Sequence, residues 1–209
     1  MSKTETYLND LAEIRSMMER SSRFISLSGL SGVAMGIYAL AGAGAAWYLM
    51  NQEGMQLEHG LARGAAGATL SLQLLFIGLV VLLLALVTGL WLTIRKSKKT
   101  GQSIWDKTAR KLLVSMLIPL VTGGILCLIF MARGFVSVVA PLTLIFYGLA
   151  LVNGSKYTLS DIHTLGLLEI GLGLLAAIFL GYGLFFWAIG FGVLHITYGF
   201  LMYRKYERG

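Results

Sequence analysis

Charged residues and cysteine are scarce in this 209-residue sequence, and each shortage narrows the class of protein. Asp, Glu, Lys and Arg make up 13% of the chain, about half of the roughly 25% found in a soluble domain. Hydrophobic residues make up 56% and the mean hydropathy is +0.76, a balance typical of a membrane protein. The single cysteine, Cys127, excludes both an intrachain disulfide and a CxxC redox motif.

Motifs that would indicate an enzyme are also absent. The sequence contains no HExxH, no nucleophile–base pair and no phosphate-binding loop, and GLGLL at 171–175 lies within an apolar run, where it does not fit a nucleotide fingerprint. The net charge of +7 would suggest nucleic acid as the partner of a soluble protein. Here the positive residues fall between apolar segments, which indicates membrane topology and anionic lipid instead. We therefore expect no cofactor and no nucleic-acid partner.

The apolar runs predict an all-α polytopic membrane protein. A helix needs about 20 apolar residues to cross a bilayer, and six runs of this kind occur, at about 23–50, 67–94, 112–131, 135–152, 158–180 and 184–203. We expect a six-helix transmembrane domain over 24–204 and a cytoplasmic tail over 205–209.

The first segment, residues 1–23, predicts a cytoplasmic or interfacial amphipathic helix. Its apolar residues recur at spacings of three and four, at Leu8, Leu11, Ile14 and Met18. More than 20 mixed-charge residues precede the first apolar run, so we expect no signal peptide and a retained N-terminus. One apolar stripe serves equally for lying on the membrane, for a dimer seam or for docking a partner.

Basic residues are distributed unevenly between the two sides of a six-span topology. Fifteen of the seventeen Lys and Arg fall on the side of the two termini, and only Arg63 and Arg133 fall on the other. This asymmetry predicts that both termini lie in the cytoplasm. Seven basic residues lie in the predicted loop 95–111, where we expect contact with anionic lipid.

Small residues and prolines suggest how the helices pack. In the first span, Ser28, Gly32 and Gly36 repeat every four residues, a spacing that lets helix backbones approach closely in lipid. The contact is predicted within the chain, with a homo-oligomer or another membrane partner as the alternative. Pro119 and Pro141 are predicted inside the third and fourth helices, which each can kink.

The last two spans form a predicted hairpin that carries two ionisable residues, Glu169 and His195. Each lies nine residues from the cytoplasmic end of its helix, or roughly 13–14 Å, which is near the middle of a hydrocarbon core of about 30 Å. Consecutive antiparallel helices are usually neighbours, so the two side chains can meet if they share a face. Glycines at matching offsets suggest such a close contact between these helices: Gly166, Gly173, Gly192 and Gly199.

Three interpretations of this pair remain open. The first is a buried Glu–His bond that holds the two helices together. The second is a proton-linked site for transport or sensing. The third is a metal or haem site, with Asp161 and His163 as secondary ligands. Zinc would need a third ligand, but Asp161 and His163 lie about two turns from Glu169, which is poor geometry for one site. Haem would need His163 and His195 as its two ligands, but these histidines lie at different depths.

Two stretches carry a family resemblance. The run from Gly148 through VNGSKYTLSDIHTLGLLEIGLGLL to HITYG, and the opening TYLNDLAEIRSMMERSSRFISLSGLSG, resemble uncharacterised small integral membrane proteins of Bacteroidota bacteria. The resemblance implies an inner-membrane location and no known activity. For function we expect a non-enzymatic regulatory, sensing or scaffold protein. A small proton-coupled transporter using Glu169 and His195 is the alternative, and a membrane enzyme ranks third.

Overall fold

A computed structural model describes residues 28–52, 64–100 and 105–206. These residues form helices and short connections, with no strand among them, and six helical segments are long and apolar enough to cross a membrane. The protein is therefore an all-α polytopic membrane protein, as the apolar runs predicted. The predicted amphipathic helix over 1–23 and most of the first polar loop, 51–66, lie outside the described residues.

The six spans contain seven α-helices, because the last span is divided. The α-helices are α2 (Gly29–Gln52), α3 (Gly64–Thr100), α4 (Lys107–Ala132), α5 (Val139–Gly154), α6 (Asp161–Ile178), α7 (Gly183–Trp187) and α8 (His195–Tyr206). Single 3₁₀ turns lie at Val136–Val138, Ser155–Tyr157 and Leu180–Tyr182. A π-helical segment, η4 (Ala188–Leu194), joins α7 to α8.

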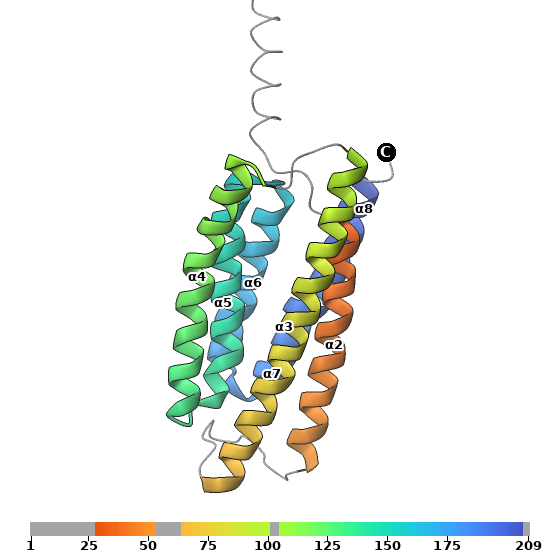
Figure 1. The fold of residues 1–209 in the computed structure, drawn as a ribbon. Coiled ribbons are helices and arrows are strands. Elements are labelled where there is room, and N and C mark those ends of the chain that lie inside the picture. The colour runs from red at the N-terminus through yellow and green to blue at the C-terminus, as the bar shows by residue number, and fades with distance from the viewer. Residues whose placement is uncertain (1–27, 53–63, 101–104, 207–209) are drawn as a thin grey trace, which may run out of the picture.

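The helices form two groups, which the last span connects. In one group α5 packs between α4 and α6, and in the other α2 packs against both α3 and α8 (Figure 1). The segment α7 contacts α5 and α6, whereas α8 packs mainly on α2. The last span thus leaves its own hairpin partner α6 and crosses to the second group, with η4 at the crossing.

Helices α3 and α4 extend into the predicted basic loop 95–111. Helix α3 continues to Thr100, so that Arg95 stacks over Trp91 at 5.7 Å on the helix rather than in a loop. Helix α4 begins at Lys107, where the side chain of Asp106 caps it by accepting from the N–H of Ala109 at 2.6 Å. The predicted boundaries were wrong here because Lys and Arg are good helix formers whose long side chains reach water from a helix end.

The two prolines occupy different helical positions. Pro119 lies inside α4, as predicted. Pro141 is the third residue of α5, a first-turn position where its missing N–H removes no helical hydrogen bond. Pro141 therefore lies within the fourth span, as predicted, but in the first turn of α5 rather than in the helix interior where a proline kinks a helix. The turn before α5 is made instead by Gly134, which adopts a φ of 84° that glycine tolerates without strain.

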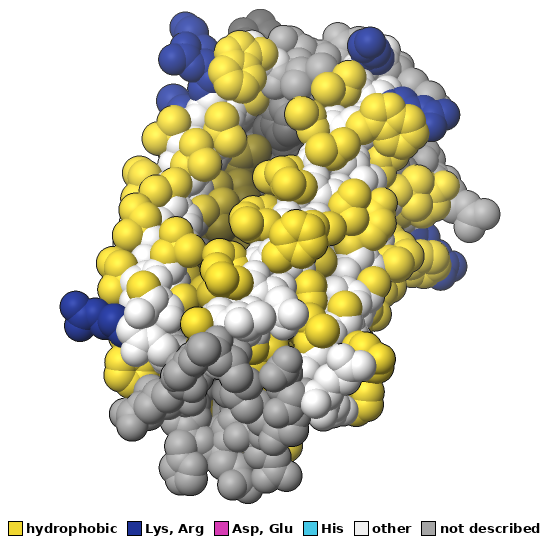
Figure 2. All heavy atoms as spheres, turned by 60° about the horizontal axis from the view of Figure 1, so that its bottom comes forward, with side chains coloured by type: hydrophobic (Ala, Val, Ile, Leu, Met, Phe, Trp, Pro, Cys, Tyr) yellow, Lys and Arg dark blue, Asp and Glu magenta, His cyan; other side chains and the backbone are white. Residues whose placement is uncertain are grey.

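The outer surface is apolar along most of the bundle. Large apolar side chains of α3 are exposed, for example Leu72, Phe76 and Val87 at 66–67%. Figure 2 shows apolar side chains covering the middle of the molecule, a hollow that they wall, and Lys and Arg near the helix ends. Such a surface suits a hydrocarbon solvent, with the charged side chains at the membrane–water boundary.

Candidate functional site

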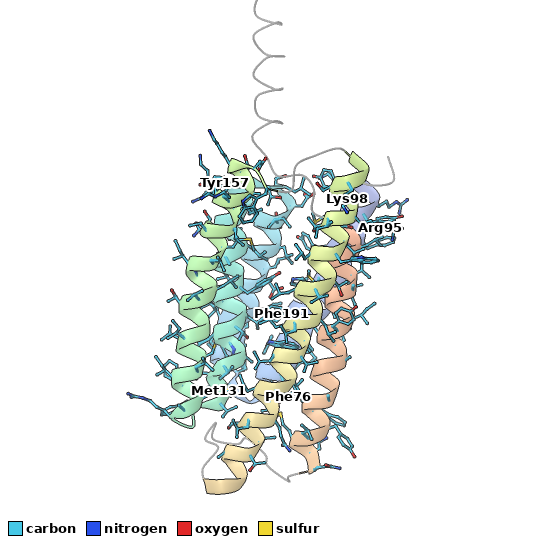
Figure 3. The ribbon with its side chains drawn as sticks, viewed as in Figure 1. Phe76, Arg95, Lys98, Met131, Tyr157 and Phe191 are labelled. Carbon is cyan, nitrogen blue, oxygen red and sulfur yellow. The ribbon has the colours of Figure 1, made fainter. Side chains whose placement is uncertain are left out.

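The structure brings Glu169 and His195 together between α6 and the start of α8. Nδ1 of His195 lies 3.4 Å from Oε1 of Glu169. Glu169 is fully buried, and only 5% of the surface of His195 is exposed. The ring of His195 also stacks on Phe191, which lies about halfway along the bundle (Figure 3). The pair therefore lies about halfway along the bundle, and its depth in a membrane stays a prediction.

A third residue, Tyr147 of α5, completes the cluster. Its hydroxyl lies 2.7 Å from Nε2 of His195. The tyrosine ring contacts both Phe191, at 4.9 Å between centroids, and His195, at 5.3 Å. The imidazole is therefore held on one edge by a hydrogen bond and on its faces by aromatic contacts, which together fix its orientation.

The backbone of η4 supplies the fourth group of the cluster. Nδ1 of His195 lies 3.0 Å from the carbonyl oxygen of Gly190, and a carbonyl can only accept a hydrogen bond. Nδ1 must therefore carry hydrogen, so in a neutral imidazole Nε2 is the acceptor and the Tyr147 hydroxyl donates to it. The backbone N–H of His195 donates to the carbonyl oxygen of Gly192, so it does not compete for the carbonyl of Gly190. π-Helical segments occur often at functional sites, and here one aims a carbonyl at the ring.

The carboxyl of Glu169 lacks a full hydrogen bond. Neither of its oxygens has a hydrogen-bond partner among the residues that the structure describes, and the 3.4 Å approach to Nδ1 is longer than an ordinary N–H···O bond. Gly190 presses against the same carboxyl, because a Cβ added there would lie 2.5 Å from Oε2. The fully buried Leu144 closes another side of the same space, since the same Cβ would meet its Cδ2 at 2.5 Å.

The arrangement is suited to holding and moving a proton. An ionised carboxylate is costly in a low-dielectric interior unless it is paired. Nδ1 of His195 lies within 3.4 Å of both the Glu169 carboxyl and the Gly190 carbonyl. A proton added to the cluster can reside on the carboxyl or on the imidazole, and each choice changes which of the 3.0 Å and 3.4 Å contacts is favoured. Among the residues that the structure describes, no three His, Cys, Asp or Glu side chains form a group that could hold a metal.

The secondary candidates, Asp161 and His163, lie away from this cluster at the beginning of α6. Asp161 accepts from Lys205 at 3.0 Å and from the hydroxyl of Tyr206 at 2.9 Å. His163 is exposed and its Nδ1 lies 3.3 Å from the hydroxyl oxygen of Ser155. Eight residues of helix, or about 12 Å, separate Asp161 from Glu169. The structure therefore does not bring these two residues into one site with Glu169 and His195.

The glycines predicted between the last two helices pack against other helices. A Cβ on Gly166 or Gly173 would meet the backbone of α5, at Gly148 and Ile145 respectively. A Cβ on Gly199 would lie 2.6 Å from the backbone nitrogen of Val33 in α2, and Gly192 packs on Leu40 of the same helix. The predicted glycine-lined contact between the last two helices is thus wrong, because α8 leaves α6 for α2.

The small residues of the first span supply the other side of the α2–α8 contact. A Cβ on Gly36 would lie 2.6 Å from the carbonyl oxygen of Gly192, and one on Gly32 would lie 3.1 Å from Cα of Gly199. Ser28 lies just before α2, where its carbonyl accepts from the hydroxyl of Ser31 at 2.6 Å. The contact lies within the chain, so α2 holds α8 close enough to fix the position of His195.

Sequence reasoning missed Tyr147 and Gly190. A signal for Tyr147 was present, since tyrosine in a membrane helix usually lies at the interface, whereas this one is the ninth residue of the sixteen in α5. A tyrosine at mid-span needs a hydrogen-bond partner for its hydroxyl. No comparable signal existed for Gly190, because the sequence contains 26 glycines and nothing marks the one whose carbonyl meets a side chain.

Comparison with known proteins adds no relative to this description. No protein-family model, curated protein or solved structure matches the chain. The resemblance to membrane proteins of Bacteroidota thus stays a prediction. Fold and site together describe an all-α polytopic membrane protein with a buried glutamate–histidine–tyrosine cluster about halfway along the bundle.

Proposed function

We propose that this chain is a non-enzymatic membrane protein with a sensing or regulatory role, in which protonation of the Glu169–His195 pair alters the position of the last span. The proposal rests on one observation: the carboxyl of Glu169 is fully buried, adjoins an imidazole at 3.4 Å, and has no full hydrogen bond among the described residues. A pair that served packing alone would be expected to satisfy its buried oxygens, because an unsatisfied buried group costs about 1–3 kcal/mol.

The last span is suited to respond to such a change. It contains the π-helical η4 next to the carboxyl, and it contacts both helix groups. Gly190, Gly192 and Gly199 each lie directly against a neighbouring helix, so a small shift of this span would change its contacts with α5, α6 and α2. A change in the charge of the pair alters the balance between the Gly190 and Glu169 contacts of His195, and the shift would be transmitted along α8 to α2.

The experiment measures the distance between α6 and α8 as a function of pH. Spin labels at the exposed positions Leu168 and Leu201, in a Cys127→Ala background, report this distance by pulsed electron resonance in liposomes. We expect it to change between ~pH 5 and ~pH 8 in the wild-type sequence and to stay constant in Glu169→Gln. Asp161→Asn, which removes a carboxylate outside the cluster, should keep the change. A constant distance in the wild-type sequence would reduce the pair to a packing role.

A small proton-coupled transporter is the second candidate, favoured by the interruption of the last span beside the buried acid. Transporters place discontinuous helices at mid-membrane binding sites. The structure also contains a hollow between α6 and α8, at the end where α6 begins and α8 finishes, but neither Glu169 nor His195 lines it. Proton uptake by liposomes containing the protein, measured with an enclosed pH dye, separates the two proposals. Proton uptake by the wild-type protein that is lost in Glu169→Gln would favour transport. An absence of proton uptake by the wild-type protein would favour sensing.

The proposed location is the bacterial inner membrane, with both termini in the cytoplasm. The fifteen-to-two distribution of basic residues supports this orientation. The same distribution supports anionic lipid as the partner of residues 95–111. The proposed protein partner is a second copy of this chain or another membrane protein. Nucleic acid is not proposed as a partner.

A further inference from the structure

A hollow of about 420 Å³ lies between α6 and α8, at the end of the bundle where α8 finishes. Ligand pockets usually range over roughly 300–1,000 Å³. The hollow exists because the two helices diverge: α8 packs on α2, and its contact with α6 is slight. In a bilayer, a space of this kind between two spans is open to lipid.

The lining of the hollow divides into an apolar wall and a polar rim. The apolar wall consists of three residues of α8: Tyr198, Leu201 and Met202. The α6 side of the hollow is lined by Asp161 and Thr164. Arg204 and Lys205, in the last turn of α8, lie at the rim. An amphipathic ligand with a polar head at the helix ends and a chain toward the membrane interior fits this division.

The charges at the rim leave one cation in excess. Lys205 donates to both carboxylate oxygens of Asp161, at 3.2 and 3.0 Å, so these two charges neutralise each other. Tyr206 also donates to Asp161. Arg204 lines the same hollow and has no ion-pair partner in the part of the chain that the structure describes. Its guanidinium is suited to bind a phosphate with two parallel hydrogen bonds.

We propose that this hollow binds the phosphate headgroup of an anionic glycerophospholipid, with Arg204 on the phosphate and an acyl chain along Leu201 and Met202. The beginning of α6 and the end of α8 lie at the level of the lipid headgroups when both segments span the bilayer. The Asp161–Lys205 pair forms one side of the entrance. This site is separate from the buried cluster and from the predicted lipid contact of residues 95–111.

The test titrates the full-length chain in detergent with phosphatidylglycerol, with phosphatidylcholine of the same acyl chains, and with inorganic phosphate, and counts bound ligand by native mass spectrometry. We expect phosphatidylglycerol to bind most tightly. Arg204→Gln should weaken that binding about tenfold, the size of one lost charged hydrogen bond, and Arg204→Lys should weaken it less. Arg133→Gln removes an exposed arginine at the end of α4, outside both the hollow and residues 95–111, and should leave binding unchanged.

A second variant tests the apolar wall without touching the charge. Leu201→Trp enlarges an exposed side chain that lines the hollow and should also reduce phosphatidylglycerol binding, even if Arg204→Gln fails to fold. Equal binding of the two lipids would overturn the proposal, as would equal effects of Arg204→Gln and Arg133→Gln. Inorganic phosphate binding as tightly as the lipid would indicate a free-phosphate site and would overturn the assignment to lipid.

Discussion

The hydroxyl of Tyr147 lies 2.7 Å from Nε2 of His195, although 48 positions separate the two residues in the chain. This bond joins α5 to the beginning of α8 and so links the two helix groups about halfway along the bundle. Because Nδ1 is engaged by the Gly190 carbonyl, both nitrogens of the imidazole have partners. The remaining group of the cluster, the Glu169 carboxyl, is the one without a full hydrogen bond.

The first prediction removes this bond. Tyr147→Phe leaves Nε2 of His195 buried without its donor, and we expect a loss of about 1–3 kcal/mol in the free energy of unfolding. Tyr182→Phe is the control, since Tyr182 is 66% exposed and its hydroxyl has no described partner, and it should be nearly neutral. Both are measured by denaturant unfolding in the same detergent. Equal stability of the two variants would mean that the bond contributes nothing.

The second prediction concerns the coupling of Glu169 to His195. Glu169→Leu and His195→Leu each remove one side of the 3.4 Å contact between the two residues, so their costs should not add in the double variant. Measured couplings between polar pairs in membranes average about 0.6 kcal/mol and reach about 1.7 kcal/mol, and we expect a value in this range. Asp161→Asn combined with His195→Leu is the control cycle and should be additive. An additive result for both cycles would contradict a direct interaction.

The third prediction tests the space beside the carboxyl. Gly190→Ala introduces a Cβ 2.5 Å from both Oε2 of Glu169 and Cδ2 of Leu144, and overpacking of this kind costs about 1–3 kcal/mol. Gly171→Ala, on α6, meets nothing within 4 Å and should be neutral or slightly stabilising, because alanine is the better helix former. The midpoint of thermal unfolding distinguishes the two. A Gly190→Ala protein as stable as Gly171→Ala would show that the carboxyl moves aside easily.

The fourth prediction tests the contact between α2 and the last span. A Cβ at Gly36 would lie 2.6 Å from the carbonyl oxygen of Gly192, so Gly36→Ala should separate the helices and destabilise the protein by about 1–3 kcal/mol. Gly44→Ala, two turns further along α2, meets nothing within 4 Å and is the matched control. Crosslinking between α2 and α8 should weaken only in Gly36→Ala.

The fifth prediction concerns orientation. A reporter enzyme that is active only in the periplasm, fused after residue 209, should be inactive, because the distribution of basic residues predicts that this end lies in the cytoplasm. A fusion within the predicted polar loop 51–66 should be active and serves as the positive control. Strong activity at the C-terminal fusion would reverse the proposed topology.

The sequence by itself determined the class of protein, the six spans and the place of the two ionisable residues near the middle of their spans. These follow from local properties: an apolar run must be about 20 residues long to cross a bilayer, and its backbone must then be helical to satisfy its own hydrogen bonds. Glu169 and His195 stand out because ionisable residues are costly in such runs. Helix ends were less well predicted, since Arg95 is as compatible with a helix as with a loop.

Only the tertiary structure decided which surfaces meet. The four glycines predicted between the last two spans face other helices, because the last span crosses between the helix groups at η4: Gly166 and Gly173 face α5, and Gly192 and Gly199 face α2. The same crossing brings the carbonyl of Gly190 and the hydroxyl of Tyr147 to the two nitrogens of His195. A helix with glycines on several faces can pack equally well on any of them, so the choice depends on all six spans together and cannot be read from one.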